Sequence, residues 1–523
     1  MTGTSEGSTQ SRTGAEWLNR DVVLLAVMLM AIVPLLYPPV PPLIDVPGHM
    51  ARYRVMLGTD AATLGQWYSF DWKLIGYLGC DLLVALIAPL IGLEPAVKLV
   101  TMIIVLVGSA GILSLSRVVH GRVQPSALFA LPLIYHMTFL YGFLNYTLAM
   151  AAMLNALALW IWLGKSGRVL LRGMMFVPLS CLVWTCHVVG WMTLGLSIFA
   201  VEWVTRLQRG ERLIHATVFS GLSCLPLALP MLVFLNWSPA GDEAGSDYRA
   251  SLATKPLWLV SVLRDRWQLL DLASIAIFLM VFYYGWRSPG LRYSRPLLMA
   301  AAGLFLMFLA MPFLAAYADA RLAPYIFIFA LVALGSASAS RPADRLFAIA
   351  GLAFLIIRMT ATTISLAIES DDWKKRLVAL DHIPYGSTVA ALSTMQCKQG
   401  WRMERTGHIA GMAVVRRASF TNDQYALGDS ALLTVKGQAF GRFALDPSQI
   451  VVTRPCGPRS TAPTLSQSLR DLPRDQFDMV WLMDPGPHRG ITDGLDLVWS
   501  DGRDAVFQVR QPARAVARPP LSR

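Results

Sequence analysis

Residues 21–37 read DVVLLAVMLMAIVPLLY, an apolar run that follows a short polar N-terminus. A transmembrane helix needs about 20 mainly apolar residues to cross a hydrocarbon core of about 30 Å. Long apolar runs recur along the chain, for example Val97–Leu115 and Leu346–Ile364. Because such runs are repeated, the sequence predicts a polytopic α-helical membrane protein.

The composition supports this class. The chain has 523 residues, of which 55% are hydrophobic and 15% are charged, and its mean hydropathy is +0.50. Soluble domains have about 25% charged residues. No small-residue cleavage site follows the first apolar run, so we expect a retained helix rather than a signal peptide. The net charge of +12 comes largely with basic loops, which direct topology and contact anionic lipid, so nucleic-acid binding is not expected.

The basic loops predict a topology, because Lys and Arg are enriched on the cytoplasmic side. These loops are Arg117–Arg122, Lys165–Arg172, Arg206–Arg212, Arg287–Arg295 and Arg341–Arg345. The run 74–91 contains Gly76, Gly79 and Pro89, with Asp81 near its centre, and a charge at mid-bilayer costs a few kcal/mol. We therefore expect 74–91 to lie in the outer interface. This leaves about eleven spans, with a cytoplasmic N-terminus and an extracytoplasmic C-terminus.

The composition changes after Ile368 and predicts a second domain. Short β-like runs follow, separated by turns: Ser387–Leu392, Ala413–Val415, Met479–Leu482, Leu497–Trp499 and Ala505–Val509. The expected parts are a cytoplasmic tail 1–20, a transmembrane domain 21–366 with an outer loop 41–95, an extracytoplasmic α/β domain 367–510 and a disordered tail 511–523. An outer location would permit a disulfide between Cys397 and Cys456, so paired and free thiols both remain open.

The stretch IDVPGHMARY, residues 44–53, carries the main candidate site. Pro47 suits the first turn of a helix, which places Asp45 just ahead of the helix start. His49 and Arg52 are three residues apart and share one face of that helix. A carboxylate can act as general base, and Arg suits a phosphate leaving group. We therefore predict catalysis by Asp45 and substrate binding by His49 and Arg52. The alternative is a helix cap and a contact with lipid phosphate.

Other polar residues at predicted outer loops are candidates for binding substrate or phosphate: Asp319, Arg321, His136, Asn145 and Lys255. A local ion pair between Asp319 and Arg321 would explain these two without a ligand. An aromatic belt at the membrane interface would explain most of the turn that holds His136 and Asn145. No cysteine spacing indicates a zinc site, and we predict no metal ligands.

Segments Asp45–Arg54 and Tyr141–Tyr146 look like those of a group of bacterial membrane proteins. The architecture, with a first helix, an outer loop that has an acid at its start, interfacial helices, many spans and a C-terminal outer α/β domain, resembles the GT-C superfamily of membrane glycosyltransferases. This superfamily includes the protein mannosyltransferases and the aminoarabinose transferases of lipid A. The resemblance implies a polyprenyl-phosphate-sugar donor, direct transfer with inversion, and Asp45 as the base. Many members have paired acids in this loop, whereas Val46 and Pro47 follow Asp45 here. This departure leaves both catalysis and the use of a divalent metal open.

The expected partners are the lipid bilayer, the polyprenyl-phosphate-sugar donor and a glycan, lipid or protein acceptor, at a bacterial inner membrane. A transporter or flippase for a lipid-linked or anionic solute would need charged residues within its spans, and Arg358 is nearly alone there. An O-antigen-type polymerase or ligase would need a large late outer loop, and 236–255 is modest. A non-catalytic envelope assembly protein remains open.

Overall fold

The computed structural model describes residues 14–234, 248–311, 319–336, 342–397, 400–426, 431–436, 438–457, 461–486 and 492–510. The predicted disordered tail 511–523 and residues 1–13 lie outside the described residues. Internal contacts divide the chain into two units. The first is Met1–Tyr37, Ile75–Cys80 and Val100–Ser365, and the second is Pro38–Leu74, Asp81–Leu99 and Leu366–Arg523.

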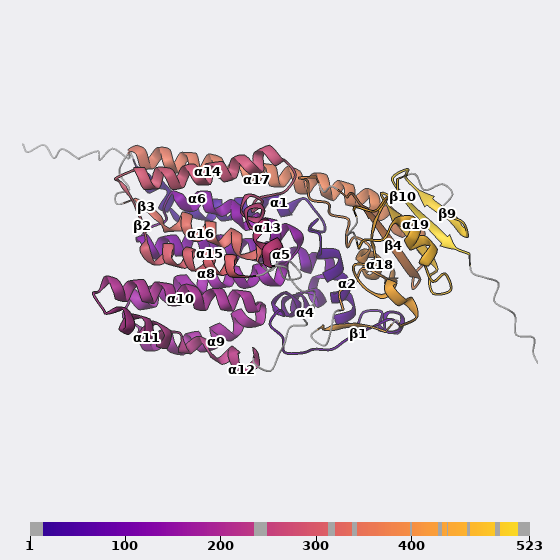
Figure 1. Cartoon of the computed structure of the whole chain (residues 1–523), viewed down its shortest axis with the longest axis horizontal. Coiled ribbons are helices and arrows are strands. Elements are labelled where there is room, and N and C mark those ends of the chain that lie inside the picture. Colours follow the sequence, from indigo (N-terminus) through magenta and orange to yellow (C-terminus); the bar gives the residue numbers. More distant parts are fainter. Residues whose placement is uncertain are drawn as a thin grey trace, which may run out of the picture. The chain divides into compact units, whose positions relative to one another are not determined.

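The first unit is built of helices (Figure 1). In chain order they are η1 (Glu16–Asn19), α1 (Asp21–Leu36), α6 (Ser126–Ala130), η2 (Leu131–Tyr135), α7 (Met137–Tyr141), α8 (Leu144–Lys165), α9 (Val169–Cys186), α10 (Val188–Gln208), α11 (Leu213–Ser223), η3 (Leu225–Leu227), α12 (Leu229–Phe234), α13 (Tyr248–Val260), α14 (Gln268–Arg287), α15 (Arg295–Ala310), η4 (Ala320–Leu322) and α16 (Ala323–Ala333). Short strands β2 (Leu291–Tyr293) and β3 (Leu334–Ser336) pair antiparallel. Helices α4 (Gly79–Ile91), α5 (Leu93–His120) and α17 (Pro342–Arg376) have residues in both units.

Six helical segments are long and apolar enough to cross a membrane: Leu93–His120, Leu144–Lys165, Val169–Cys186, Val188–Gln208, Gln268–Arg287 and Pro342–His382. Six shorter apolar segments are Asp21–Leu36, Gly79–Ile91, Ser126–Tyr141, Leu213–Leu227, Arg295–Ala310 and Ala320–Ala333. The chain is therefore a multi-pass membrane protein. The count of about eleven spans and the interfacial position of 74–91 remain predictions.

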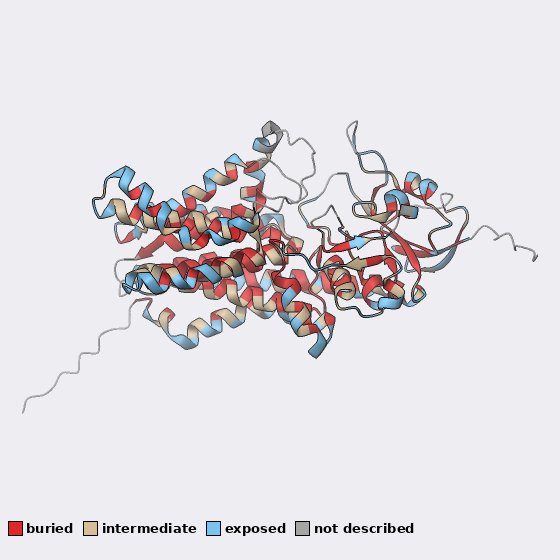
Figure 2. Ribbon diagram, turned by 90° about the horizontal axis from the view of Figure 1, so that it is seen from below, coloured by how far each residue is buried: buried red, intermediate tan, exposed pale blue. Residues whose placement is uncertain are grey.

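The helices of the first unit carry apolar residues on their outward faces as well as between them. Leu170, Ile214 and Leu269 are 79%, 79% and 84% exposed. Figure 2 shows such exposed positions along the outer sides of these helices, with buried positions between them. Lipid tails are as apolar as Leu, so a membrane helix can expose these side chains to the bilayer.

Small residues allow the helices to approach closely. A Cβ atom added to Gly190 of α10 would lie 2.6 Å from the Cβ of Ala149 in α8. A Cβ added to Gly111 of α5 would lie 2.7 Å from the Cβ of Leu154, also in α8. Glycine is therefore needed at both crossings, as is usual where membrane helices pack.

A buried ion pair explains Arg358, the charge predicted to lie within a span. Its Nη1 donates to Asp271 Oδ1 over 2.7 Å, and its Nη2 donates to the carbonyl of Leu263 over 3.2 Å. Both side chains are almost fully buried. The Asp271 carboxylate thus neutralises the Arg358 charge in the interior of the first unit. Charged residues of membrane helices normally face such an interior.

The second unit contains a six-stranded mixed sheet (Figure 1). Its strands are β4 (Thr388–Met395), β5 (Phe420–Thr421), β7 (Ile450–Val452), β8 (Met479–Met483), β9 (Leu495–Ser500) and β10 (Asp504–Val509). Strand β4 pairs parallel with β5, β7 and β8, whereas β10 pairs antiparallel with β8 and β9. Every residue of β8 is buried, as expected for a short apolar run in the middle of a sheet.

Four of the five predicted β-like runs are strands, and the prediction for Ala413–Val415 is wrong. Those residues lie in helix α18 (Gly411–Arg417) and are buried. A short apolar run fits a buried strand and a buried helix equally well, so its pattern could not distinguish them. The remaining helical elements are η5 (Leu377–His382), η6 (Gln438–Ala444) and α19 (Leu465–Asp471).

Most of the outer loop 41–95 belongs to the second unit. It contributes α2 (Val46–Met56), α3 (Ala61–Leu64) and β1 (Tyr68–Phe70), and β1 pairs antiparallel with β6 (Leu433–Val435). The Tyr68 hydroxyl donates to the carbonyl of Thr421 over 3.1 Å. The stretch that carries Asp45 thus folds together with C-terminal residues.

Cys397 and Cys456 form a disulfide, with their Cα atoms 5.0 Å apart. This resolves the choice between pairing and free thiols that the sequence left open. The bond joins the loop after β4 to the loop after β7. The disulfide therefore links these two loops of the second unit covalently.

Candidate functional site

Asp45 lies at the position predicted for it, immediately before α2. Pro47 occupies the first turn of this helix, and the Asp45 side chain makes no capping hydrogen bond. The residue is only 7% exposed. Capping therefore does not explain why an acidic side chain is buried here, because the carboxylate does not bind the free N–H groups of the helix start.

A histidine from the C-terminal part of the chain faces this carboxylate. His408 Nε2 lies 3.8 Å from Asp45 Oδ1 and 3.8 Å from Asp446 Oδ1. Its Nδ1 lies 3.0 Å from the carbonyl oxygen of Asp423. A carbonyl oxygen only accepts, so Nδ1 carries the hydrogen and donates. Nε2 is thereby left facing two carboxylates, an arrangement that favours the imidazolium form.

Close backbone packing brings these residues together. A Cβ added to Gly411 of α18 would lie 2.6 Å from the carbonyl oxygen of Pro47, so only glycine fits there. Gly48 lies against the His408 ring, with an added Cβ 3.4 Å from Nδ1. In addition, Arg405 donates from Nη1 to the carbonyl of Pro42 over 2.7 Å. These contacts hold the start of α2 against the segment 405–411.

The electrostatics of the cluster follow from burial and charge. Burial of His408 acts to lower its pKa, but the carboxylates of Asp45 and Asp446 and the groups of Asp423 outweigh burial, and the pKa is raised. Burial also raises the pKa of Asp423, whose Oδ1 accepts from Thr421 and Gln424. Asp446 Oδ1 accepts from Gln449 over 2.5 Å. The carboxylates around His408 therefore favour its protonated form.

This arrangement predicts a pH-dependent loss of stability in the variant His408→Gln. The pKa of His408 is raised in the folded state. The stabilisation from His408 is therefore complete below its unfolded-state pKa of 6.5, and it is lost as the pH rises through its folded-state pKa. We expect a loss of about 3 kcal/mol at pH 5.5, the cost of breaking a buried pair, and a smaller loss at pH 9. Melting curves of purified wild type and variant at both pH values measure it.

His382 provides the matched control, since it is only partly buried and stacks on Trp499 with ring centroids 5.8 Å apart. His382→Gln should lower the melting temperature less than His408→Gln at pH 5.5. An equal shift for His408→Gln at pH 5.5 and pH 9 would contradict the imidazolium assignment.

The other residues predicted on α2 have identified partners. Arg52 Nη2 lies 2.8 Å from Asp81 Oδ1, and the Asp81 side chain is fully buried. The His49 ring stacks on Tyr53 with centroids 6.3 Å apart. Asp81, which the sequence marked as costly near the centre of 74–91, is therefore compensated by Arg52.

The first unit holds a second group around Arg321. Arg321 Nη1 lies 3.4 Å from His187 Nε2. Its guanidinium lies 4.3 Å from the ring centroid of Phe143 and 5.5 Å from that of Tyr146, and the Tyr146 hydroxyl donates to the Arg321 carbonyl. Phe143 and Tyr146 of the Tyr141–Tyr146 motif thus make cation–π contacts with Arg321.

Asp319 forms an ion pair with Lys255. Lys255 Nζ lies 2.6 Å from Asp319 Oδ2 and 2.7 Å from the Met311 carbonyl oxygen, and Lys255 and Asp319 are both buried. The structure therefore brings Lys255 and Asp319 together as a buried pair.

His136 and Asn145 also have structural partners. His136 is buried, and its Nδ1 accepts from the backbone N–H of Phe139 over 3.0 Å, which caps α7. Asn145 Oδ1 accepts from the backbone N–H of Cys80 over 2.6 Å. Within the described residues, no group of three or more His, Cys, Asp or Glu side chains could hold a metal ion.

Sequence reasoning missed His408, Asp423 and Asp446. The available signal was weak: a polar run, Asn422–Gln424, directly follows the two-residue strand β5, and all of its residues are buried. Buried polar side chains at a strand end are typical of a site or of a hydrogen-bond network. Only the fold places them beside Asp45.

Comparison with known proteins finds solved structures that are similar to this chain. No family model matches the chain, and no curated protein matches it. ArnT from Cupriavidus metallidurans in the apo state is 13% identical, with 94% of this chain and 97% of that chain covered and a TM-score of 0.48. The same protein bound to undecaprenyl phosphate is also 13% identical, with 94% and 98% covered and a TM-score of 0.47.

Proposed function

We propose that this chain is a membrane glycosyltransferase that transfers a sugar from a polyprenyl-phosphate donor to an extracytoplasmic acceptor with inversion. The observation that carries the proposal is the buried Asp45 side chain, which makes no capping hydrogen bond and lies 3.8 Å from His408 Nε2. A protonated His408 would favour the ionised form of Asp45, which a general base needs before it takes a proton.

In this reaction the acceptor hydroxyl oxygen attacks the anomeric carbon of the donor. Asp45 takes the hydroxyl proton while the bond between the anomeric carbon and the phosphate oxygen breaks. Polyprenyl phosphate leaves with the bonding electrons, and Arg52 stabilises its negative charge, as a guanidinium does well. Direct displacement from the opposite face inverts the anomeric configuration. Arg321, His49 and the other predicted binding residues remain candidates for contacts with donor or acceptor.

The proposed location is a bacterial inner membrane, with the N-terminus cytoplasmic and the second unit extracytoplasmic. The Cys397–Cys456 disulfide supports this orientation, because disulfides persist in oxidising compartments such as the periplasm. The acceptor is a glycan, lipid or protein of the envelope. A transporter is less well supported, since Arg358 is paired with Asp271 and offers no charge to a pathway.

A donor-selection assay tests the proposal. Purified protein in lipid vesicles receives a panel of polyprenyl-phosphate-linked sugars or the matching nucleotide sugars, together with envelope extract as acceptor. We expect protein-dependent release of polyprenyl phosphate from at least one lipid-linked donor and no consumption of nucleotide sugars. Release equal to that of vesicles without the protein across the panel would contradict the proposal.

A further inference from the structure

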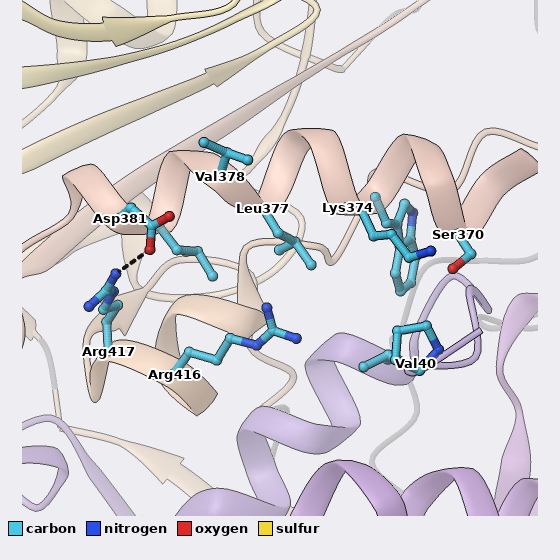
Figure 3. Close-up of a pocket in the computed structure, with 11 residues that line it drawn as sticks. Val40, Ser370, Lys374, Leu377, Val378, Asp381, Arg416 and Arg417 are labelled. Carbon is cyan, nitrogen blue, oxygen red and sulfur yellow. Dashed lines mark hydrogen bonds and ion pairs between the residues drawn. The ribbon is translucent and has the colours of Figure 1, made fainter. Parts of the chain in front are cut away.

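A cavity of about 270 Å³ opens in the second unit, between the polar end of α17, η5 and α18 (Figure 3). It lies apart from the Asp45 cluster, and none of Asp45, His408 and Asp446 lines it. The segment 39–40 that follows α1 forms another part of its wall.

The cavity has a buried apolar wall. Val40 is 5% exposed, Trp373 is 2% exposed and Leu380 is 2% exposed. The Trp373 indole N–H donates to the carbonyl of Arg405 over 3.2 Å, which fixes the ring. Such a wall suits the apolar part of an amphipathic ligand, as is usual in ligand pockets.

Cations predominate among the charged residues of the lining. Lys374, Arg416 and Arg417 line the cavity, against the single carboxylate Asp381. Asp381 is paired with Arg417 over 2.8 Å, the dashed contact in Figure 3. The hydroxyl of Ser370 adds a neutral donor beside Lys374. The other two cations, Lys374 and Arg416, have carboxylate partners that do not line the cavity.

Those two cations have exposed, exchangeable partners. Arg416 binds Glu94 through Nε and Nη2 over 2.8 and 2.9 Å, and Lys374 binds Asp371 over 3.0 Å. The Arg416 and Glu94 side chains are 38% and 28% exposed. Exposed ion pairs contribute little to stability, so a phosphate can replace the carboxylate at small cost. A guanidinium binds phosphate through the same pair of parallel hydrogen bonds.

The cavity lies where apolar helices end. Val40 follows closely on α1, which ends at Leu36, and Glu94 is in the first turn of α5. Ser370 and Trp373 belong to the polar end of α17, just after the apolar run that ends at Ile368. Two parts of the lining thus follow the apolar runs of α1 and α17 along the chain, and lipid headgroups are concentrated where such runs leave the membrane.

We propose that this cavity binds the phosphate headgroup of an anionic membrane lipid. The phosphate lies between Arg416 and Lys374 and displaces Glu94 from Arg416. The glycerol and the first acyl carbons lie against Trp373 and Val40. The site is distinct from the proposed catalytic site, and its occupancy requires no sugar transfer.

Phosphatidylglycerol binding, measured by native mass spectrometry of protein released from phosphatidylglycerol or phosphatidylcholine nanodiscs, tests the site. Each Lys or Arg near a lipid phosphate contributes about fivefold, so Lys374→Gln with Arg416→Gln should weaken binding about 25-fold. Glu94→Gln should strengthen binding, because it removes the competing carboxylate. This opposite sign separates a lipid site from an ion pair that only supports folding.

Arg442→Gln is the matched control, since Arg442 is 41% exposed and paired with Asp471 over 3.0 Å in the same unit. It should retain phosphatidylglycerol at the wild-type level. Displacement by soluble glycerol 3-phosphate would show that the phosphate alone is recognised, and persistence would show that the lipid is required. Unchanged binding in the double variant, or weaker binding in Glu94→Gln, would overturn the proposal.

Discussion

Replacing Asp45 by Asn should lower the rate of sugar transfer by about 10²–10⁴, the usual contribution of a positioned general base. Asn has nearly the shape of Asp and is an equally good residue before a helix, so α2 should form normally. It has no basic oxygen, so the acceptor hydroxyl keeps its proton. The measurement is transfer from the polyprenyl-phosphate donor in membranes with matched protein levels.

Asp446→Asn is the matched control, because Asp446 lies at the same distance of 3.8 Å from His408 Nε2 as Asp45 does. It changes the same imidazolium cluster but removes no proposed base, so its rate loss should be far smaller. Equal losses in the two variants would assign the effect to the cluster as a whole. Unchanged transfer by Asp45→Asn would remove this residue from catalysis.

Replacing Arg376 by Gln should destabilise the second unit by about 3–5 kcal/mol, the cost of leaving a buried charge without its partner. Arg376 at the end of α17 is 1% exposed and donates to three carboxylates. Its bonds to Asp372, Asp484 and Asp504 range from 2.6 to 2.9 Å. The Asp504 side chain is fully buried, so water cannot replace the guanidinium there. Melting of the purified protein measures the effect.

Arg503 offers the comparison within the same cluster. It also binds Asp372 and Asp484, but it is 47% exposed. Arg503→Gln should therefore cost at most about 1 kcal/mol, as is usual for exposed ion pairs. A melting shift for Arg503→Gln as large as that for Arg376→Gln would show that burial does not determine how much these ion pairs contribute to the free energy of unfolding.

The membrane fold was readable from the sequence because bilayer thickness fixes the length of an apolar run. The segments around Leu144–Lys165 and Gln268–Arg287 needed no tertiary information. The second unit was predicted less well. Its central strands were visible as apolar runs, but Ala413–Val415 fits helix and strand equally, and the pairing of β1 with β6 joins segments with no local signal.

The candidate site was likewise only partly predictable from the sequence. The position of Asp45 follows from local chemistry, because Pro47 marks the helix start. Its partners do not, since His408 and Asp446 come from the far end of the chain and meet it only through tertiary packing. The sequence also did not reveal the partner of Arg52. Asp81 by itself is a costly charge within an apolar run, and in the fold it forms an ion pair with Arg52.

The anomeric configuration of the product tests the central proposal most directly. A donor of known configuration is converted by the purified protein, and the glycosidic bond of the product is assigned by NMR. Direct attack by an acceptor that Asp45 deprotonates predicts inversion, with one equivalent of polyprenyl phosphate released. Retention of configuration, or a product formed without release of polyprenyl phosphate, would contradict it.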